Sequence, residues 1–103
     1  MEKIFIKNRN NKKLCVLLEK SNNQQGLVFI EHGLGGFKEQ KHIQIMADSF
    51  RETDYTVVRF DTTSTLGDSE GSYGDATLTN YYQDLEDVIK WAEDQEWYQE
   101  PFV

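Results

Sequence analysis

The clearest chemical signal in this sequence is an apolar run that ends in a glycine-rich turn. Residues 27–31 read Leu-Val-Phe-Ile-Glu, and residues 32–36 read His-Gly-Leu-Gly-Gly. Helix N-termini present unpaired backbone N–H groups, and a glycine-rich approach lets a negative group come close to them. The pattern therefore predicts an anion-binding corner between a buried strand and a helix, which a phosphate or a reacting oxygen could use.

Other polar groupings point to no metal or cofactor. His32 and His42 stand ten residues apart with Glu31 and Glu39 nearby, whereas zinc sites need closer, convergent spacing. No P-loop sequence is present. We therefore expect no metal site and no cofactor.

Acidic residues gather in the second half of the chain. Asp84, Glu86 and Asp87 form a run on a predicted helix, which we interpret as a solvated face.

The composition limits the class of partner. The chain has 103 residues, enough for one small domain, and a net charge of −7. Residues 1–25 hold six Lys/Arg and two acidic residues, a balance of +4, and the rest hold five and sixteen, a balance of −11. We interpret this as a solvated basic hairpin beside acidic helices, and we expect neither a nucleic-acid nor a membrane partner.

Cysteine content and hydropathy indicate the compartment. Cys15 is the single cysteine, which excludes an internal disulfide and suits a reducing environment. No apolar run approaches the roughly 18 residues that a membrane helix needs, and the N-terminus lacks the apolar core of a signal peptide. We expect a cytoplasmic protein.

Hydrophobic periodicity places the elements that would position the glycine-rich corner. They are a hairpin at residues 3–19, a strand at 27–31, a loop at 32–37, a helix at 39–52, a strand at 55–61, a helix at 77–95 and the start of another strand at 101–103. Ile43, Met46, Ala47 and Phe50 make one buried helical stripe. The order predicts an α/β fold in which an antiparallel hairpin leads into a parallel sheet with right-handed crossovers.

These features resemble the N-terminal part of the α/β-hydrolase superfamily, most nearly its esterase and serine-aminopeptidase-like branch. Residues 32–36 resemble the family's oxyanion loop. Residues 57–61 with the small-residue loop at 67–71 resemble its fourth strand and the loop after it, and residues 81–91 resemble its next helix. The resemblance covers about residues 4–103, so we treat residues 1–103 as part of one α/β-hydrolase domain.

The resemblance implies acyl transfer on carboxylic esters or amides, with the oxyanion held by two backbone N–H groups. It implies that the N–H of Leu34 is one of the two. Gly33 and Gly35 would let the backbone turn that N–H inward, with Gly36 completing the loop. His32 would brace the loop by hydrogen bonding and would not act as the catalytic base.

The catalytic triad falls outside this sequence. The family's nucleophile lies on a Gly-x-Ser-x-Gly elbow directly after the fifth strand, and here that strand is only beginning at Phe102 and Val103. The catalytic acid and histidine of the family come later still. We therefore expect no catalytic residue in this chain, a nucleophile beyond Val103, and no activity of the chain alone.

A literal Gly-x-Ser-x-Gly does occur, at residues 67–71. A nucleophile must stand at the tip of a strand and open a helix, with a base within reach. Ser69 lies eight residues past Asp61, where the predicted strand ends, and the next helix begins near residue 77. We interpret residues 67–71 as a flexible surface loop near the entrance of the site.

Two alternatives remain open at this stage. In the family's strand order the third strand lies between the fourth and the fifth, so a missing fifth strand would leave an apolar edge able to self-associate or bind a complementary fragment. That edge comprises Leu27, Val28, Phe29 and Ile30. The other alternative is a phosphate- or nucleotide-binding half-domain.

Overall fold

The computed structural model describes residues 1–65 and 67–103, apart from the side chain of Tyr73. Its elements are β1 (Glu2–Lys7), β2 (Lys13–Glu19), β3 (Gly26–Glu31), α1 (Lys41–Glu52), β4 (Tyr55–Phe60), a 3₁₀ turn (Tyr73–Asp75) and α2 (Leu78–Ala92). Against the predicted bounds, α1 begins two residues later and α2 ends three residues earlier.

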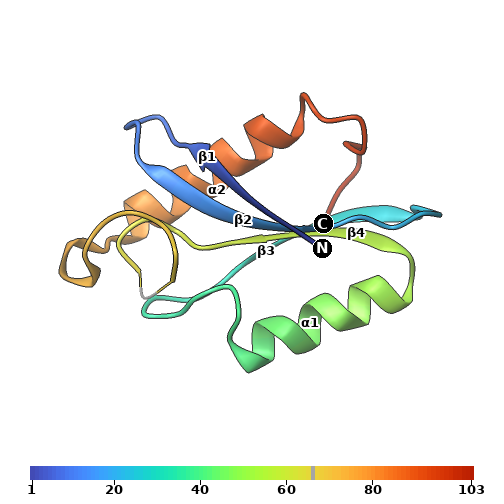
Figure 1. Cartoon of the computed structure of the whole chain (residues 1–103), viewed down its shortest axis with the longest axis horizontal. Coiled ribbons are helices and arrows are strands. Elements are labelled where there is room, and N and C mark those ends of the chain that lie inside the picture. The colour runs from blue at the N-terminus through green and yellow to red at the C-terminus, as the bar shows by residue number, and fades with distance from the viewer. Residues whose placement is uncertain (66) are drawn as a thin grey trace.

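The four strands form one mixed sheet in the order β1-β2-β4-β3 (Figure 1). β1 and β2 form an antiparallel hairpin, and β2 is also antiparallel to β4. β3 runs parallel to β4, with Gly26 opposite Tyr55 and Glu31 opposite Phe60. The predicted α/β fold, a hairpin leading into a parallel pair, is confirmed.

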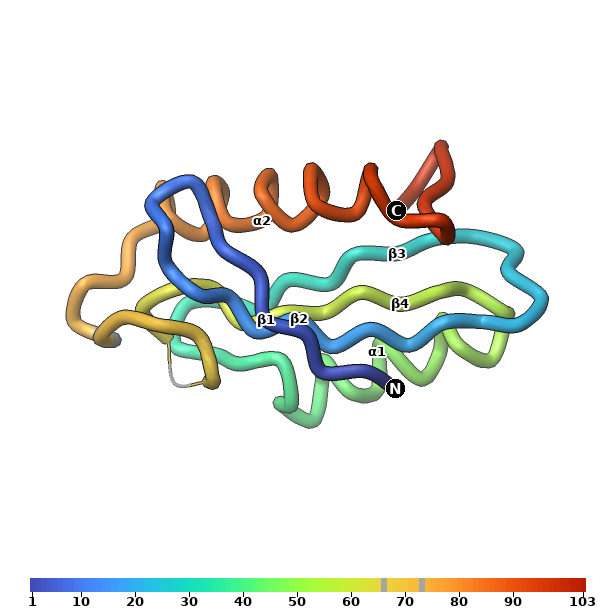
Figure 2. The backbone as a smooth tube through the Cα atoms, turned by 45° about the horizontal axis from the view of Figure 1, so that its top comes forward, coloured from blue at the N-terminus to red at the C-terminus, as the bar shows by residue number. Residues whose placement is uncertain are grey.

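Each face of the sheet is covered by one helix, α1 below and α2 above in the view of Figure 1. The tube in Figure 2 shows the same arrangement, with α1 and α2 on opposite sides of the strands. On the α1 side, Ile43 and Ala47 pack against Val28, Ile30 and Val57. Apolar burial on both faces explains why residues 27–31 lack alternation.

In the predicted α1 stripe, Phe50 is partly buried and one residue is exposed. Ile43 is 2% exposed and Ala47 is fully buried, but Met46 is 44% exposed. Met46 lies at the margin of the buried side of the helix, where α1 no longer faces the sheet.

The helix α2 begins with a capping box. Thr77 accepts a hydrogen bond from the backbone N–H of Asn80, and the Asn80 side chain accepts one from the backbone N–H of Thr77. Val88 lies on the buried face of α2 and packs in one hydrophobic core with buried residues of β2, β3 and β4.

The C-terminal residues lie against the outer edge of β3. Val103 N–H donates to the Leu27 carbonyl at 3.0 Å, and Phe29 N–H donates to the Val103 carbonyl at 3.0 Å. This pair of bonds is the pattern of a parallel ladder in which Val103 lies opposite Val28. The ring of Phe102 contacts Phe29 edge-on, with the ring centroids 5.0 Å apart.

Cys15 is a fully buried free thiol on β2. Within residues 1–65 and 67–103, no helix is both long enough and apolar enough to cross a bilayer.

Candidate functional site

The glycine-rich corner forms a tight turn directly after β3. Gly36 N–H donates to the Gly33 carbonyl at 2.9 Å, and Gly35 has a φ of +80°. This is the geometry of a type II turn with Leu34 at its second position and glycine at its third. The Leu34 side chain is 61% exposed, and in the described parts of the chain its N–H has no protein acceptor. The turn thus presents a backbone donor that is free to bind a ligand atom.

His32 fastens this turn to the end of β4. Its ring is 3% exposed, and its Nε2 lies 3.1 Å from the backbone N–H of Thr62. Because an N–H can only donate, Nε2 must accept, so the ring proton lies on Nδ1, which donates to the Gly33 carbonyl at 2.9 Å. The edge of the ring also contacts Tyr81. Both nitrogens are therefore occupied by hydrogen bonds within the protein.

The three glycines of the turn have different roles. Gly35 needs its positive φ, which L side chains rarely adopt. A Cβ at Gly36 would collide with the side-chain oxygen of Gln40 and approach the Gly33 carbonyl to 3.0 Å. A Cβ at Gly33 would meet nothing within 4 Å, so the structure gives Gly33 no steric role.

A buried ion pair closes the far end of the loop. Lys38 and Asp61 are both fully buried. Lys38 Nζ lies 2.6 Å from Asp61 Oδ2, and Lys38 N–H donates to Asp61 Oδ1 at 2.8 Å. The ammonium also bonds Asp68 and Glu39, each at 2.9 Å. Burial acts to lower the pKa of Lys38, but the hydrogen bonds that its ammonium donates to these three carboxylates outweigh it and raise that pKa.

Asp61 also organises the loop that follows β4. The backbone N–H of Asp68 donates to Asp61 Oδ2 at 2.9 Å. A Cβ at Gly67 would collide with the Asp61 carboxylate, so only glycine allows this close approach. The Asp61 carboxylate therefore fixes the position of the glycine-rich turn relative to the loop at residues 67–71.

Several solved structures superpose on this arrangement. The Est1E protein of Butyrivibrio proteoclasticus, with ferulic acid bound, matches with a TM-score of 0.85 at 24% identity over 93% of this chain. The esterase Pf2001 of Pyrococcus furiosus matches with a TM-score of 0.81 at 23% identity over 93% of this chain. Mouse alpha/beta hydrolase domain-containing protein 10 matches with a TM-score of 0.70 at 17% identity over 86% of this chain.

This chain has the fold of the N-terminal part of an α/β hydrolase. It spans only 39%, 35% and 34% of the length of those three structures, respectively. No protein-family profile and no curated protein sequence matches it. The likeness establishes the fold, and the activity has to be argued from the residues.

Ser69 is not placed as an α/β-hydrolase nucleophile. It is 9% exposed, and its Oγ accepts from Cys15 N–H at 2.8 Å and donates to the Asp61 carbonyl at 2.6 Å. Gly71, with a φ of +110°, packs against Ser64. The expectation of a flexible surface loop is wrong at Ser69, because its hydroxyl ties β2 to the end of β4.

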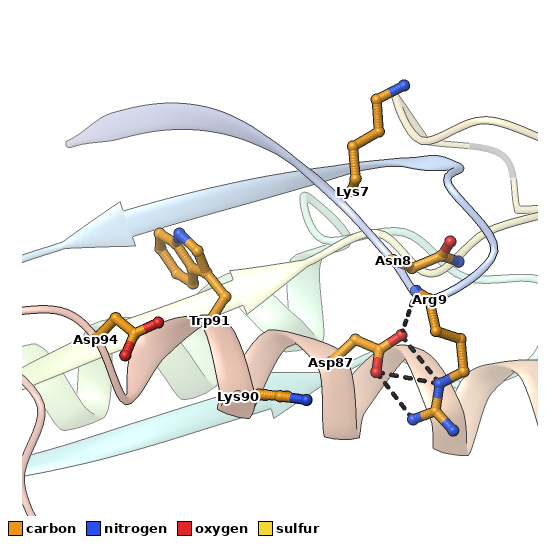
Figure 3. Close-up of a pocket in the computed structure, with 7 residues that line it drawn as sticks. All are labelled: Lys7, Asn8, Arg9, Asp87, Lys90, Trp91 and Asp94. Atoms are coloured by element: carbon orange, nitrogen blue, oxygen red, sulfur yellow. Dashed lines mark hydrogen bonds and ion pairs between the residues drawn. The ribbon is translucent and has the colours of Figure 1, made fainter.

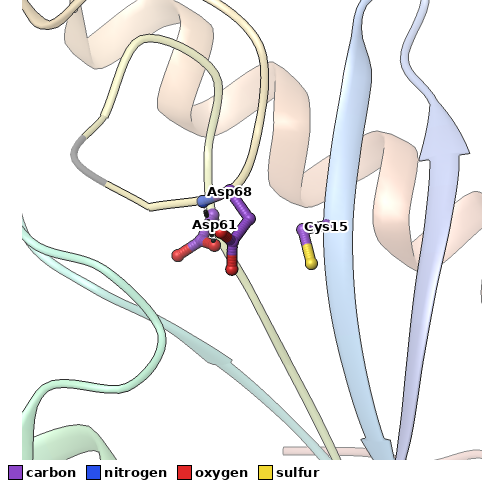
Figure 4. A group of neighbouring side chains, drawn as sticks. All are labelled: Cys15, Asp61 and Asp68. Atoms are coloured by element: carbon purple, nitrogen blue, oxygen red, sulfur yellow. Dashed lines mark hydrogen bonds between the residues drawn. The ribbon is translucent and has the colours of Figure 1, made fainter.

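A cluster of potential metal ligands adjoins the ion pair. Ligand atoms of Cys15, Asp61 and Asp68 lie within 4.8 Å of one another (Figure 4). The ammonium of Lys38 already bonds both carboxylates, and burial raises the pKa of the Cys15 thiol although Lys38 opposes this. The cluster therefore fits an internal cation better than a metal ion.

The predicted solvated acidic face is wrong for Asp84. This residue is 1% exposed and accepts hydrogen bonds from the Asn8 side chain at 2.9 Å and from the N–H and hydroxyl of Thr63 at 2.7 and 2.8 Å. The reason is that α2 turns this side toward the hairpin turn and the loop after β4. Hydrophobic periodicity alone assigns an acidic residue to the exposed face of a helix, because it does not show which hydrogen-bond donors surround that residue in the fold.

Asp87, the last residue of the acidic run, pairs with the hairpin. Arg9 donates to its carboxylate from both the backbone N–H and Nη2 at 2.8 Å (Figure 3). The pair lines a hollow of about 290 Å³ between the hairpin turn and α2. None of the residues lining this hollow belongs to the glycine-rich turn, so we assign it no part in the site.

Glu31, the last residue of β3, has a raised pKa. Burial, and then the charge of Asp84, raise its pKa to about 7. Its Oε2 is buried and has no hydrogen-bond partner among the described residues, and the same holds for the hydroxyl of Tyr81. In the sequence, Glu31 stood out only as a possible zinc ligand beside His32 and His42. In the structure His42 is exposed and His32 is buried.

Proposed function

We propose that these residues supply the oxyanion loop of a serine hydrolase acting on carboxylic esters or amides. The observation that carries the proposal is the free N–H of Leu34 at the second position of a type II turn. A backbone N–H fixed in this way can stabilise the negative oxygen of a tetrahedral intermediate, since it needs no reorganisation during the reaction.

The supports of the turn favour this role over a purely steric corner. His32 uses both ring nitrogens to hold the start of the turn. The bond from Lys38 N–H to Asp61 holds its far end. Oxyanion donors act through such preorganisation, because a donor that moved freely would lose much of its advantage over water.

The nucleophile, the acid and the base lie in polypeptide outside these residues, so residues 1–103 are inactive alone. The buried hydroxyl of Ser69 supports this proposal. The coverage of 34–39% of the matched structures supports it as well. The substrate is a small ester or amide, and a single free cysteine supports a reducing compartment such as the cytoplasm.

A second candidate function is a non-catalytic module that self-associates or binds a complementary fragment through β3. It is favoured by the position of β3 at the end of the strand order. The apolar side chains of Leu27, Val28 and Ile30 are buried. Val103 already bonds the Leu27 carbonyl and the Phe29 N–H, so the edge offers only its remaining backbone groups. Sedimentation over a concentration series tests it, and a monomer throughout would exclude self-association.

A chimera tests the hydrolase proposal. Residues 1–103 replace the matched N-terminal part of the Pyrococcus furiosus esterase Pf2001, and hydrolysis of p-nitrophenyl acetate is measured. We expect hydrolysis by the chimera and none above background by either part alone. A chimera that unfolds cooperatively and shows native circular dichroism, yet does not hydrolyse the ester, would contradict the proposal.

A further inference from the structure

Gly36 is the residue that closes the glycine-rich turn. Its N–H donates to the Gly33 carbonyl at 2.9 Å, and that carbonyl belongs to the same peptide unit as the N–H of Leu34. The C=O and N–H groups of a planar trans peptide point in opposite directions, so a contact that fixes the Gly33 carbonyl also fixes the direction of the Leu34 N–H. The position of Gly36 therefore bears directly on the candidate oxyanion donor.

Gly36 is itself held from the loop that follows β4. Its carbonyl accepts a hydrogen bond from the hydroxyl of Thr65, and both residues are buried. Across the part of the chain that the structure describes, this hydroxyl is the one donor that meets the Gly36 carbonyl. A buried carbonyl needs a donor, so the loss of this hydrogen bond is unfavourable.

Thr65 can serve as an anchor because its own loop is fixed. The preceding residue, Ser64, has a φ of +58° and donates its N–H to the Glu70 carbonyl at 2.9 Å. Thr63 donates its N–H and its hydroxyl to the buried Asp84 carboxylate at 2.7 and 2.8 Å. The Thr65 hydroxyl therefore projects from backbone that is restrained both by α2 and by the far side of the loop.

The contact from Thr65 differs from the other two that hold this segment. Thr62 N–H bonds His32 before the turn, and the Asp61 carboxylate accepts from the N–H of Lys38 after it. Thr65 reaches a residue of the turn itself. Loss of its hydroxyl should therefore loosen the turn while the residues on either side stay in place.

We propose that Thr65 is a positioning residue of the glycine-rich turn, whose hydroxyl holds the Gly36 carbonyl and thereby the direction of the Leu34 N–H. Its consequence for catalysis rests on the proposed function, in which that N–H binds the oxyanion. A donor with a fixed direction stabilises developing charge better than one that must reorient. Loss of the hydroxyl should therefore lower kcat and leave KM nearly unchanged.

Two substitutions separate the hydroxyl of Thr65 from the shape of its side chain. Thr65→Val keeps the shape and removes the donor, whereas Thr65→Ser keeps the donor and removes a methyl group. Thr53→Val is the matched control, because it removes a hydroxyl-to-carbonyl hydrogen bond at the exposed end of α1. For each form of the 103-residue chain, the order parameter of the Leu34 amide is measured by NMR relaxation of its nitrogen.

We expect an order parameter of about 0.85 in the unmodified chain, in Thr65→Ser and in Thr53→Val, and one below about 0.6 in Thr65→Val. An equal order parameter in Thr65→Val and the unmodified chain would overturn the role of Thr65. A value in Thr65→Ser as low as that in Thr65→Val would overturn it as well, because the hydroxyl would then not be the cause.

A second measurement needs no variant and so does not depend on whether Thr65→Val folds. In the unmodified chain, the hydroxyl proton of Thr65 should exchange with water slowly enough to give its own NMR signal, because it is buried and donates to the Gly36 carbonyl. Absence of this signal would overturn the hydrogen bond on which the inference depends.

The same substitutions in the chimera with esterase Pf2001 test the consequence for catalysis. We expect Thr65→Val to lower kcat about tenfold with KM within about twofold, and Thr65→Ser to keep kcat within about twofold. A loosened Leu34 amide with unchanged kcat would contradict the catalytic consequence. A chimera that does not hydrolyse the ester with Thr65 in place contradicts the proposed function instead, and the order parameters still decide the role of Thr65.

Discussion

Lys38 Nζ lies 2.6 Å from Asp61 Oδ2, and neither side chain is exposed to solvent. The two residues come from different segments, one from the loop after β3 and the other from the end of β4. Their pairing makes the position of the glycine-rich turn depend on β4 as well as on its own strand. We regard this ion pair as the anchor of the candidate site.

Lys38→Met is expected to destabilise the fold by about 3–5 kcal/mol, because it leaves the Asp61 carboxylate buried without its cation. Urea unfolding followed by circular dichroism measures the loss in the free energy of unfolding. A variant that is unfolded without urea would represent the largest loss expected. The matched control is Lys3→Met, which removes an exposed partner of Asp68 and should have a much smaller effect. Equal effects of the two substitutions would contradict the anchoring role.

The helices, the strands and the glycine-rich corner could be predicted because they depend on local patterns. The stripe of Ile43 and Ala47 and the unbroken apolar run at residues 27–31 both follow from burial. Two of the three carboxylates that bond Lys38, those of Asp61 and Asp68, could not be predicted, because they stand 23 and 30 positions away. A lysine before a helix is normally solvated, and only tertiary contacts overrule that expectation.

Glu31 should make stability depend on pH in a definite direction. Its pKa is raised in the folded state from 4.5 to about 7, so the folded state binds more protons and stability falls as pH rises between these values. Glu31→Gln removes this loss. Relative to the unmodified chain, the variant should therefore gain about 1–2 kcal/mol between pH 5 and pH 8, after allowance for the partial exposure of the carboxyl group.

Urea denaturation at pH 5, 6.5 and 8 measures this difference. Glu52→Gln, which changes an exposed glutamate at the end of α1, is the control for the loss of one surface charge. A stability difference between Glu31→Gln and the unmodified chain that is the same at all three pH values would show that Glu31 is not perturbed.

Ser69→Ala should act on stability and not on chemistry. The substitution leaves Cys15 N–H without its buried acceptor and removes a donor to the Asp61 carbonyl, for a loss of about 1–3 kcal/mol. Ser72→Ala, at an exposed position of the same loop, is the control. Hydrolysis of a p-nitrophenyl ester by the 103-residue chain that disappeared in Ser69→Ala would instead make Ser69 a nucleophile.

The candidate site was only partly visible in the sequence. Gly35 has a positive φ. The sequence alone can suggest this, because glycine is favoured where a turn requires a positive φ. The hydrogen bond from Thr62 to His32 joins residues 30 positions apart, so it needs the parallel pairing of β3 and β4. The burial of Asp84 depends in the same way on Asn8 and Thr63, which approach it from two other segments.

The most direct test of the central claim is to remove the N–H of Leu34 and nothing else. Proline is favoured at the second position of a type II turn, and the preceding Gly33 tolerates it. Leu34→Pro in the chimera with esterase Pf2001 should therefore keep the fold but lower kcat by about 10²–10³, while Leu34→Ala should retain kcat within a few-fold. Equal kcat values for the proline and alanine variants, both folded, would contradict the assignment of this amide to the oxyanion.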